Sequence, residues 1–220
     1  MSAPVDAKYL VANINGVLTN EVVWSSLKNH VDVPGVGGAG TSEEYDTATT
    51  GLTWDVAPVT VDSNTTYKSH LYVNHNTATE IYGVKSWSPS GAFDARCKMA
   101  NGSTGAQNDT GLVIHNSGNT ERLLVRTTQV GNELRIEAFT YAGSFIQRGV
   151  SWVAGGGDVY LRITRDGANN VSFYWSSDGY AWINIDTVAF TTTVAKLGFR
   201  CNCISAVDYY MLVDWLRTDV

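Results

Sequence analysis

The sequence has little charge. Only 16% of its 220 residues are charged, and 15 basic against 21 acidic side chains give a net charge of −6. A nucleic-acid-binding protein needs a basic surface to neutralise phosphates, so nucleic acid is not an expected partner. The chain is 44% hydrophobic and 11% aromatic, well away from the composition of disordered proteins. We therefore expect one folded chain with a sizeable core.

Long apolar runs are also missing. No stretch approaches the ~20 apolar residues of a transmembrane helix, so membrane insertion is not expected. The N-terminal residues MSAPVDAKYLVANI contain Asp6 and Lys8 and do not read as a secretory signal. Either a signal has been removed or any export follows another route.

Cysteine is scarce as well, with Cys97, Cys201 and Cys203 only. An odd, low number does not describe a disulfide framework. Cys201 and Cys203 would share one face of a strand and are poorly placed to bridge each other. No further ligands complete a zinc site. We interpret the cysteines as small buried hydrophobes, with a bridge from Cys97 as the alternative.

Helical periodicity is nearly absent, whereas alternation of apolar and polar residues recurs along the chain. Phe93, Ala95, Cys97 and Met99 alternate with polar residues, which predicts a half-buried strand. Further strands are predicted at residues 71–73, 112–115, 123–127, 134–139, 159–164, 171–176, 181–187, 197–203 and 209–216. Asn101-Gly102, Asp166-Gly167 and Asp178-Gly179 predict tight turns. Many short strands of this kind are typical of an all-β sandwich or jelly roll.

The N-terminal part differs from the rest. Residues 31–51 are rich in Gly and Thr and poor in large apolar residues, which favours a linker. We predict an extended N-terminal arm and linker over residues 1–50 and one β-sandwich domain over residues 51–220.

Two segments carry a family resemblance. YLVANINGVLTNEVVW, Tyr9 to Trp24, resembles the YLV and LTNERV element of bacteriophage tail-fibre and other virion proteins, with Val22 where that element usually has Arg. DVYLRITRDGANNVSFYWSSDGYAWINIDTV, Asp158 to Val188, resembles the core hairpin of concanavalin A-like domains such as those appended to β-xylosidases. Val213 to Arg217 resembles the closing strand of that family, and residues 111–115 and 122–126 resemble two of its other strands. The resemblance implies a concanavalin A-like jelly roll of two antiparallel sheets, a fold that serves lectins, carbohydrate-binding modules, hydrolases and structural modules alike.

The sequence offers no catalytic pair. Glycosidases need two carboxyl groups about 5 to 9.5 Å apart, whereas Glu133 and Glu137, four residues apart on one strand, would be separated by about 13 Å. With Arg135 between them they read as a solvent-facing charge ladder. His70 and His75 would point to opposite faces of a strand, which argues against a shared metal. We therefore expect no enzyme activity and name no catalytic residue.

The fold family implies that a structural calcium ion is conceivable, because concanavalin A-like domains often bind one. Asp62, Asp94, Asp109 and Asp214 are the candidates, but they have no diagnostic spacing. We name no metal ligand and expect no cofactor.

Aromatic residues remain as the route to function. Sugars stack their apolar faces on Trp and Tyr while polar side chains bind the hydroxyl groups. The candidates for carbohydrate binding are Trp87, Trp152, Tyr174, Trp175 and Tyr180, whereas Trp182 is expected in the core.

The function hypothesis is a non-enzymatic phage virion protein, in a tail fibre or as capsid decoration, with a carbohydrate-binding β-sandwich. Its partners would be other virion proteins and host-surface polysaccharide. It would form homo-oligomers, assemble in the host cytoplasm and be exposed on the virion to the medium. The alternatives are a carbohydrate-binding accessory domain of a secreted bacterial glycosidase, or a polysaccharide hydrolase or lyase. The net charge of −6 implies that attraction to anionic glycans would come from stacking and hydrogen bonds.

Overall fold

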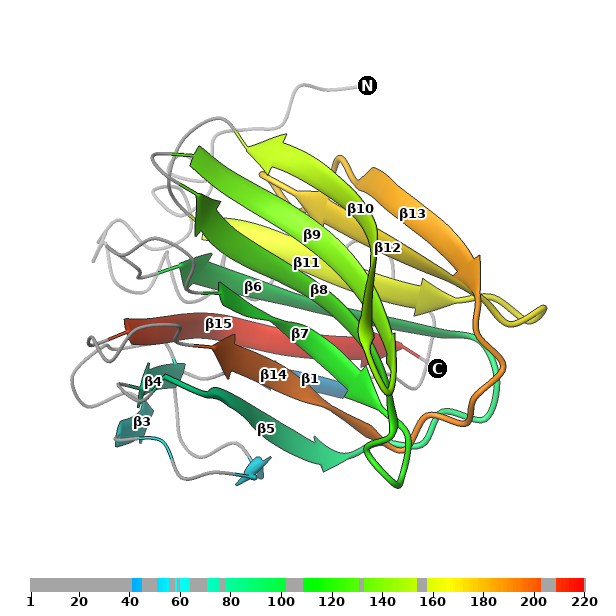
Figure 1. The fold of residues 1–220 in the computed structure, drawn as a ribbon, viewed down its shortest axis with the longest axis horizontal. Coiled ribbons are helices and arrows are strands. Elements are labelled where there is room, and N and C mark those ends of the chain that lie inside the picture. Colours follow the sequence, from blue (N-terminus) through cyan, green and yellow to red (C-terminus); the bar gives the residue numbers. More distant parts are fainter. Residues whose placement is uncertain are drawn as a thin grey trace, which may run out of the picture. The chain divides into compact units, whose positions relative to one another are not determined.

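Two antiparallel sheets stacked face to face make up the part of the chain that the structure describes (Figure 1). The computed structural model describes residues 41–44, 51–55, 58, 60–63, 71–75, 78–101, 109–130, 133–153, 158–202 and 209–219. Within these residues the regular elements are all strands, and no helix long and apolar enough to cross a bilayer is found. The predicted all-β jelly-roll sandwich is confirmed.

Sheet A contains eight strands and sheet B seven. The order in sheet A is β13 (Ile183–Ala189), β12 (Asn170–Ser176), β11 (Asp158–Arg165), β6 (Phe93–Asn101), β15 (Tyr209–Asp219), β4 (Leu71–His75) and β3 (Thr60–Ser63), with β1 (Thr41–Glu44) also paired to β15. The order in sheet B is β10 (Phe145–Val153), β9 (Glu133–Ala142), β8 (Glu121–Val130), β7 (Asp109–His115), β14 (Lys196–Asn202), β5 (Glu80–Ser86) and β2 (Thr53–Trp54).

The core lies between the sheets and follows the alternation of the sequence. In β11 the buried residues Val159, Leu161 and Ile163 alternate with more exposed ones, because successive side chains of a strand point to opposite faces. Cys97 and Cys201 are both fully buried, as predicted, and burial raises the pKa of the Cys97 thiol. Cys203 lies outside the described residues.

The β11–β12 hairpin has its turn at the predicted Asp166-Gly167, but the residue with positive φ is not the glycine. Asp166 Oδ1 accepts hydrogen bonds from the backbone N–H groups of Ala168 and Asn170. The left-handed position is taken by Asn169, with φ of 63°, a conformation that Asn tolerates. At the Asp178-Gly179 turn the glycine itself has φ of 78°. The turn predicted at Asn101-Gly102 extends beyond the described residues.

A β-bulge in β15 changes which side chains face the core. The register with β6 shifts between Val213 and Trp215, so that Val213 and Leu216 both join the core while Trp215 pairs with Lys98. Asp214, at the bulge, accepts a hydrogen bond from Lys98 Nζ at 3.0 Å. A bulge of this kind leaves one residue outside the ladder.

Strand pairing begins earlier than the predicted domain boundary. β1 falls within residues 1–50 and pairs with β15 from Thr41↔Thr218 to Glu44↔Trp215, and residues 38–220 group as one compact unit. Residues 1–40, with the LTNEVVW element, lie outside the described part. The division at residue 50 therefore stays a prediction.

Candidate functional site

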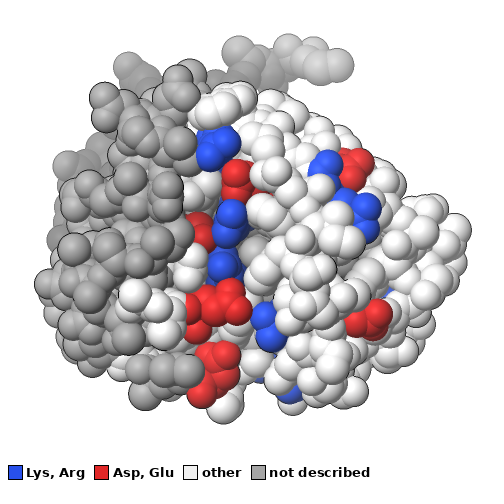
Figure 2. Space-filling view, viewed as in Figure 1, with Lys and Arg blue, Asp and Glu red and all other residues white. Residues whose placement is uncertain are grey.

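The outer face of sheet B, which points away from the core, carries four rows of side chains that run across the strands. Cross-strand partners point to the same face of a sheet, so the strand registers define each row. We number them row 1 (Trp152, Arg135, Thr128, Asp109, Asn202, Glu80), row 2 (Val150, Glu137, Arg126, Gly111, Arg200, Tyr82), row 3 (Gln147, Phe139, Leu124, Val113, Gly198, Val84) and row 4 (Phe145, Tyr141, Arg122, His115, Lys196, Ser86). Figure 2 shows acidic and basic side chains following one another in a line across this face, beside a ridge of uncharged residues.

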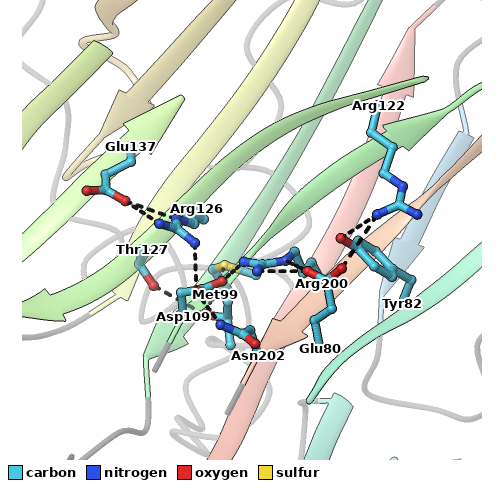
Figure 3. Close-up of polar contacts among 11 residues, drawn as sticks. Glu80, Tyr82, Met99, Asp109, Arg122, Arg126, Thr127, Glu137, Arg200 and Asn202 are labelled. Atoms are coloured by element: carbon cyan, nitrogen blue, oxygen red, sulfur yellow. Dashed lines mark hydrogen bonds and ion pairs between the residues drawn. The ribbon is translucent and has the colours of Figure 1, made fainter. Parts of the chain in front are cut away.

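Charged side chains of rows 1 and 2 form a continuous ion-pair network (Figure 3). Arg126 lies between two carboxylates, with Nη2 2.7 Å from Glu137 Oε2 and Nη1 2.7 Å from Asp109 Oδ2. Asp109 also binds Arg200, whose Nη2 lies 3.0 Å from Glu80 Oε2. Charge-assisted hydrogen bonds of this kind are the strong ones, and they fix the polar side chains of these rows in place.

Glu137 and Asp109 are buried, although they are on the outer face. They are only 4% and 1% exposed. The prediction that Glu137 belongs to a solvent-facing ladder with Arg135 is therefore wrong. Arg126 covers Glu137 from β8, and Arg135 Nη2 lies 3.9 Å away. Removing a partner from such buried charges is costly.

A small apolar cluster is formed by three residues of row 3 together with Tyr82 of row 2, and Phe145 covers it from outside. Val113, Leu124, Phe139 and Tyr82 are buried together, apart from the main core. The Phe145 ring packs edge-on against Phe139, with centroids 5.9 Å apart. Phe145 belongs to β10, whose register with β9 shifts between Gln147 and Gly149.

Arg122 covers the same cluster from row 4. Its guanidinium carbon lies 4.4 Å from the centroid of the Tyr82 ring and 4.7 Å from that of Tyr141. Arg122 Nη1 also donates a hydrogen bond to the Tyr82 hydroxyl at 2.8 Å. Burial, as the largest cause, raises the pKa of Tyr82 to about 12, so this hydroxyl stays protonated at neutral pH.

Gly111 lets β7 and β8 approach closely in the middle of row 2. A methyl group on it would collide with the carbonyl oxygen of Val125 and lie 2.8 Å from the Cα of Arg126. Close backbone approach is a standard reason for glycine within a strand. Gly111 sits between Arg126 and Arg200, both of which reach Asp109.

His115 is the buried titratable base of row 4. It is 2% exposed, its Nδ1 lies 3.2 Å from Asn119 Oδ1, and its Nε2 has no hydrogen-bond partner among the described residues. Burial, as the largest cause, lowers the pKa of His115 to about 4. His115 is therefore neutral in the folded protein at pH 7.

We expect His115 to make the protein acid-sensitive between pH 6.5 and 4. In the unfolded chain this histidine takes up a proton below its ordinary pKa of about 6.5, whereas the folded form resists protonation down to about 4. Its contribution is therefore present above pH 6.5 and is lost as the pH falls, by about 3 kcal/mol in all. Urea unfolding at pH 7 and pH 4.5 should show a smaller loss of stability in His115→Gln than in the wild type. Equal losses in both proteins would contradict the expectation.

The five aromatic candidates for carbohydrate binding are not brought together. Trp152 is 55% exposed at the β10 end of row 1, where the Arg135 guanidinium carbon lies 4.9 Å from its ring centroid. Tyr174 lies on the outer face of sheet A, paired with Arg162. Tyr180 is exposed in the β12–β13 loop. Trp87 is partly buried against the core, with its ring edge-on to Phe93.

Trp175 is a core residue and has no free face for a sugar. It is 7% exposed, and its Nε1 donates a hydrogen bond to Ser151 Oγ of β10, in the opposite sheet, at 2.8 Å. Val171, Phe173 and Trp175 alternate along β12, and all three are buried. Trp182, expected in the core, is instead half-buried, with the Arg162 guanidinium carbon 5.3 Å from its ring centroid.

Three of the four aspartates considered for calcium are paired with cations and do not fit a calcium site. Asp94 binds Arg162 through both carboxylate oxygens, Asp109 binds two arginines and Asp214 binds Lys98. Calcium requires several oxygen ligands around one point, and no group of three candidate metal-binding side chains exists among the described residues. The side chain of Asp62 lies outside them.

The sequence interpretation gave no role in binding to the arginines of this face. Arg122 and Arg126 are four residues apart on β8 and therefore share a face, and Arg135 and Arg200 lie at outward positions of β9 and β14. The same alternation that predicts the buried core positions marks these outward arginines. Their convergence depends on strand order, which alternation does not give.

No family model and no curated protein matches this sequence. Solved structures do match its fold. A GH43 protein of Bacillus licheniformis, BlXynB in a mutant form, has a TM-score of 0.65 at 16% identity, with 81% of this chain and 39% of that chain covered. The CBM2 module of the evolved Dit of Lactobacillus casei phage J-1 has a TM-score of 0.59 at 10% identity, covering 81% and 96%. The carbohydrate recognition domain of Emp47p has a TM-score of 0.52 at 9% identity, covering 81% and 94%. The chain thus spans about two fifths of the length of the GH43 protein. At these identities the likeness shows the fold alone, an all-β jelly-roll sandwich.

Proposed function

We propose that this chain is a non-enzymatic virion protein of a bacteriophage, in a tail fibre or as capsid decoration, that adheres to carbohydrate through the outer face of sheet B. The observation that carries the proposal is the position of Trp152, an exposed ring at the end of a row of fixed polar groups. An exposed ring offers an apolar surface on which a sugar can stack, and neighbouring polar side chains can bind its hydroxyl groups. Asn202 and Glu80, which are both partly exposed, provide such groups along row 1.

A binding role suits this face better than hydrolysis. Glycosidases place their two carboxyl groups on either side of the scissile bond. Here the two buried carboxylates, Glu137 and Asp109, both bind Arg126, which occupies the space between them. We therefore assign no catalytic role to either residue.

The virion assignment rests on two supports. The LTNEVVW element resembles virion proteins, and the CBM2 module of a phage Dit shares the fold. We propose other virion proteins and host-surface polysaccharide as partners, and a homo-oligomer exposed on the virion as the working form. A second candidate, an accessory domain of a secreted glycosidase, is favoured by the GH43 likeness. Neighbouring capsid and tail genes would support the first role, and a neighbouring glycosidase gene would overturn it.

A glycan array probed with the full chain tests the adhesive role. We expect Trp152→Ala to weaken the strongest interaction by about 30-fold, because truncating a central aromatic side chain typically costs ~2 kcal/mol or more. Tyr180→Ala is the matched control, since Tyr180 is equally exposed but lies in the β12–β13 loop. Absence of any binding by the full chain, or a loss with Tyr180→Ala alone, would overturn the proposed site. Release of reducing or unsaturated sugar ends from a polysaccharide would show an enzyme.

A further inference from the structure

The cations of the outer face of sheet B differ in how well their charge is neutralised. Among the side chains described in rows 1 to 4, Arg122, Arg126, Arg135, Arg200 and Lys196 accompany three carboxylates. Arg126 and Arg200 have carboxylate oxygens within 3.1 Å. All three carboxylates of the face form their short ion pairs with these two arginines.

The other three cations are less closely paired: two have a carboxylate only at longer distance, and the third binds an amide. Arg135 Nη2 is 3.9 Å from Glu137, Arg122 Nη1 is 3.7 Å from Glu80, and Lys196 Nζ donates to the amide oxygen of Asn119. The Nε atoms of both Arg122 and Arg135 also lack an acceptor. Both guanidinium groups therefore keep hydrogen-bonding capacity that the carboxylates of this face do not satisfy, and an oxyanion can reach them through the exposed part of each side chain.

Aromatic rings hold both arginines in place. Arg135 stacks on Trp152, and Arg122 lies against both Tyr82 and Tyr141. Their side chains are still 26% and 16% exposed. A guanidinium fixed by stacking loses little entropy on binding, and its planar fork matches a carboxylate or a phosphate.

These positive groups lie at two ends of the face. Arg135 is in row 1 beside Trp152, whereas Arg122 and Lys196 are in row 4. Six residues of β9 separate the two rows, which corresponds to about 20 Å. An extended chain that carries a negative group on successive units can reach both ends at once.

We infer that the ligand of this face is an acidic glycan, whose oxyanions bind Arg135 at one end and Arg122 with Lys196 at the other. The inference rests on the proposed carbohydrate-binding function and specifies its ligand. The overall charge of −6 does not oppose it, because salt screens charges beyond about 8 Å in physiological solution. The attraction is local, and ionic contacts add to the stacking and hydrogen bonds expected from the sequence.

The test compares two sugars that differ in the charge of one group per unit. Oligogalacturonate and its methyl ester share one backbone, but the ester has no carboxylate. Isothermal titration of the full chain should give at least about tenfold weaker binding for the ester, because hydrogen bonds between charged groups are markedly stronger than neutral ones. Raising the salt concentration should weaken binding of the acid and leave the affinity for the ester unchanged. A glycerol-phosphate polymer as a third probe distinguishes phosphate from carboxylate as the preferred oxyanion.

Variants show which arginines cause the preference for the acid. We expect Arg135→Gln and Arg122→Gln each to reduce the preference for the acid over the ester. Arg148→Gln is the matched control, because Arg148 donates to Thr140 Oγ1 and belongs to none of the four rows. Equal binding of acid and ester would overturn this inference and leave carbohydrate binding intact. An equal loss of affinity for acid and ester in Arg135→Gln would also overturn this inference. Absence of binding to any glycan would overturn the proposed function as well.

Discussion

Replacing Arg126 with methionine should destabilise the protein by about 3 kcal/mol, because it leaves buried carboxylates without their shared cation. Asp109 would retain Arg200 and Asn202. Glu137 would retain the Gln147 amide at 3.3 Å and Arg135 at 3.9 Å, which is a poor substitute for two hydrogen bonds of 2.7 and 3.0 Å. Urea unfolding at pH 7, followed by circular dichroism, measures the change.

A second substitution separates charge from packing. Arg126→Met combined with Glu137→Gln removes the unpaired carboxylate, so the double variant should be more stable than Arg126→Met alone, as a double-mutant cycle would show. Arg148→Met is the matched control, since Arg148 is exposed and a surface change of this kind costs about 0.5 kcal/mol or less. If Arg126→Met reduced the free energy of unfolding no more than Arg148→Met does, the ion pairs of the network would contribute little to stability.

The strands that the sequence predicts most clearly are those with uninterrupted alternation. β6, β11 and β14 each have one apolar and one polar face, so their period is visible. β10 was missed, and its residues FIQRGVSWV show why: the register shift between Gln147 and Gly149 breaks the alternation. β5 was missed because Ile81 and Tyr82, which point to opposite faces, are both buried, so the strand has no polar face to reveal its period.

The candidate site was less predictable than the fold. Its residue type makes Trp152 a candidate, and it is exposed on the face we propose; its role in binding stays a prediction. The network around it joins Glu80, Asp109, Arg126 and Arg200, which come from four strands. Such contacts depend on β7 lying between β8 and β14, and local sequence patterns carry no information on strand order. Alternation can give the face on which a residue lies, but not its neighbours on that face.

The second large effect is the loss of stability expected when Trp175 is truncated. Trp175 is buried in the core, which argues against a role in sugar binding. Trp175→Ala should cost about 3 to 5 kcal/mol, as truncation of a large buried aromatic side chain leaves a cavity. The same change also removes the hydrogen bond from Nε1 to Ser151 Oγ, which joins β12 of sheet A to β10 of sheet B. Urea unfolding of the variant measures the loss.

Two further variants show whether stability and binding separate as the structure requires. Trp175→Phe keeps most of the ring and loses the hydrogen bond, so we expect a cost of about 1 kcal/mol. Trp152→Ala removes an exposed ring and should change stability by about 0.5 kcal/mol or less while weakening glycan binding. The opposite pattern, in which Trp175→Ala stays as stable as the wild type and loses its glycan, would return Trp175 to the binding site. The two tryptophans are of the same residue type and lie 23 positions apart, but only one faces solvent, so burial decides which of them can contribute to binding.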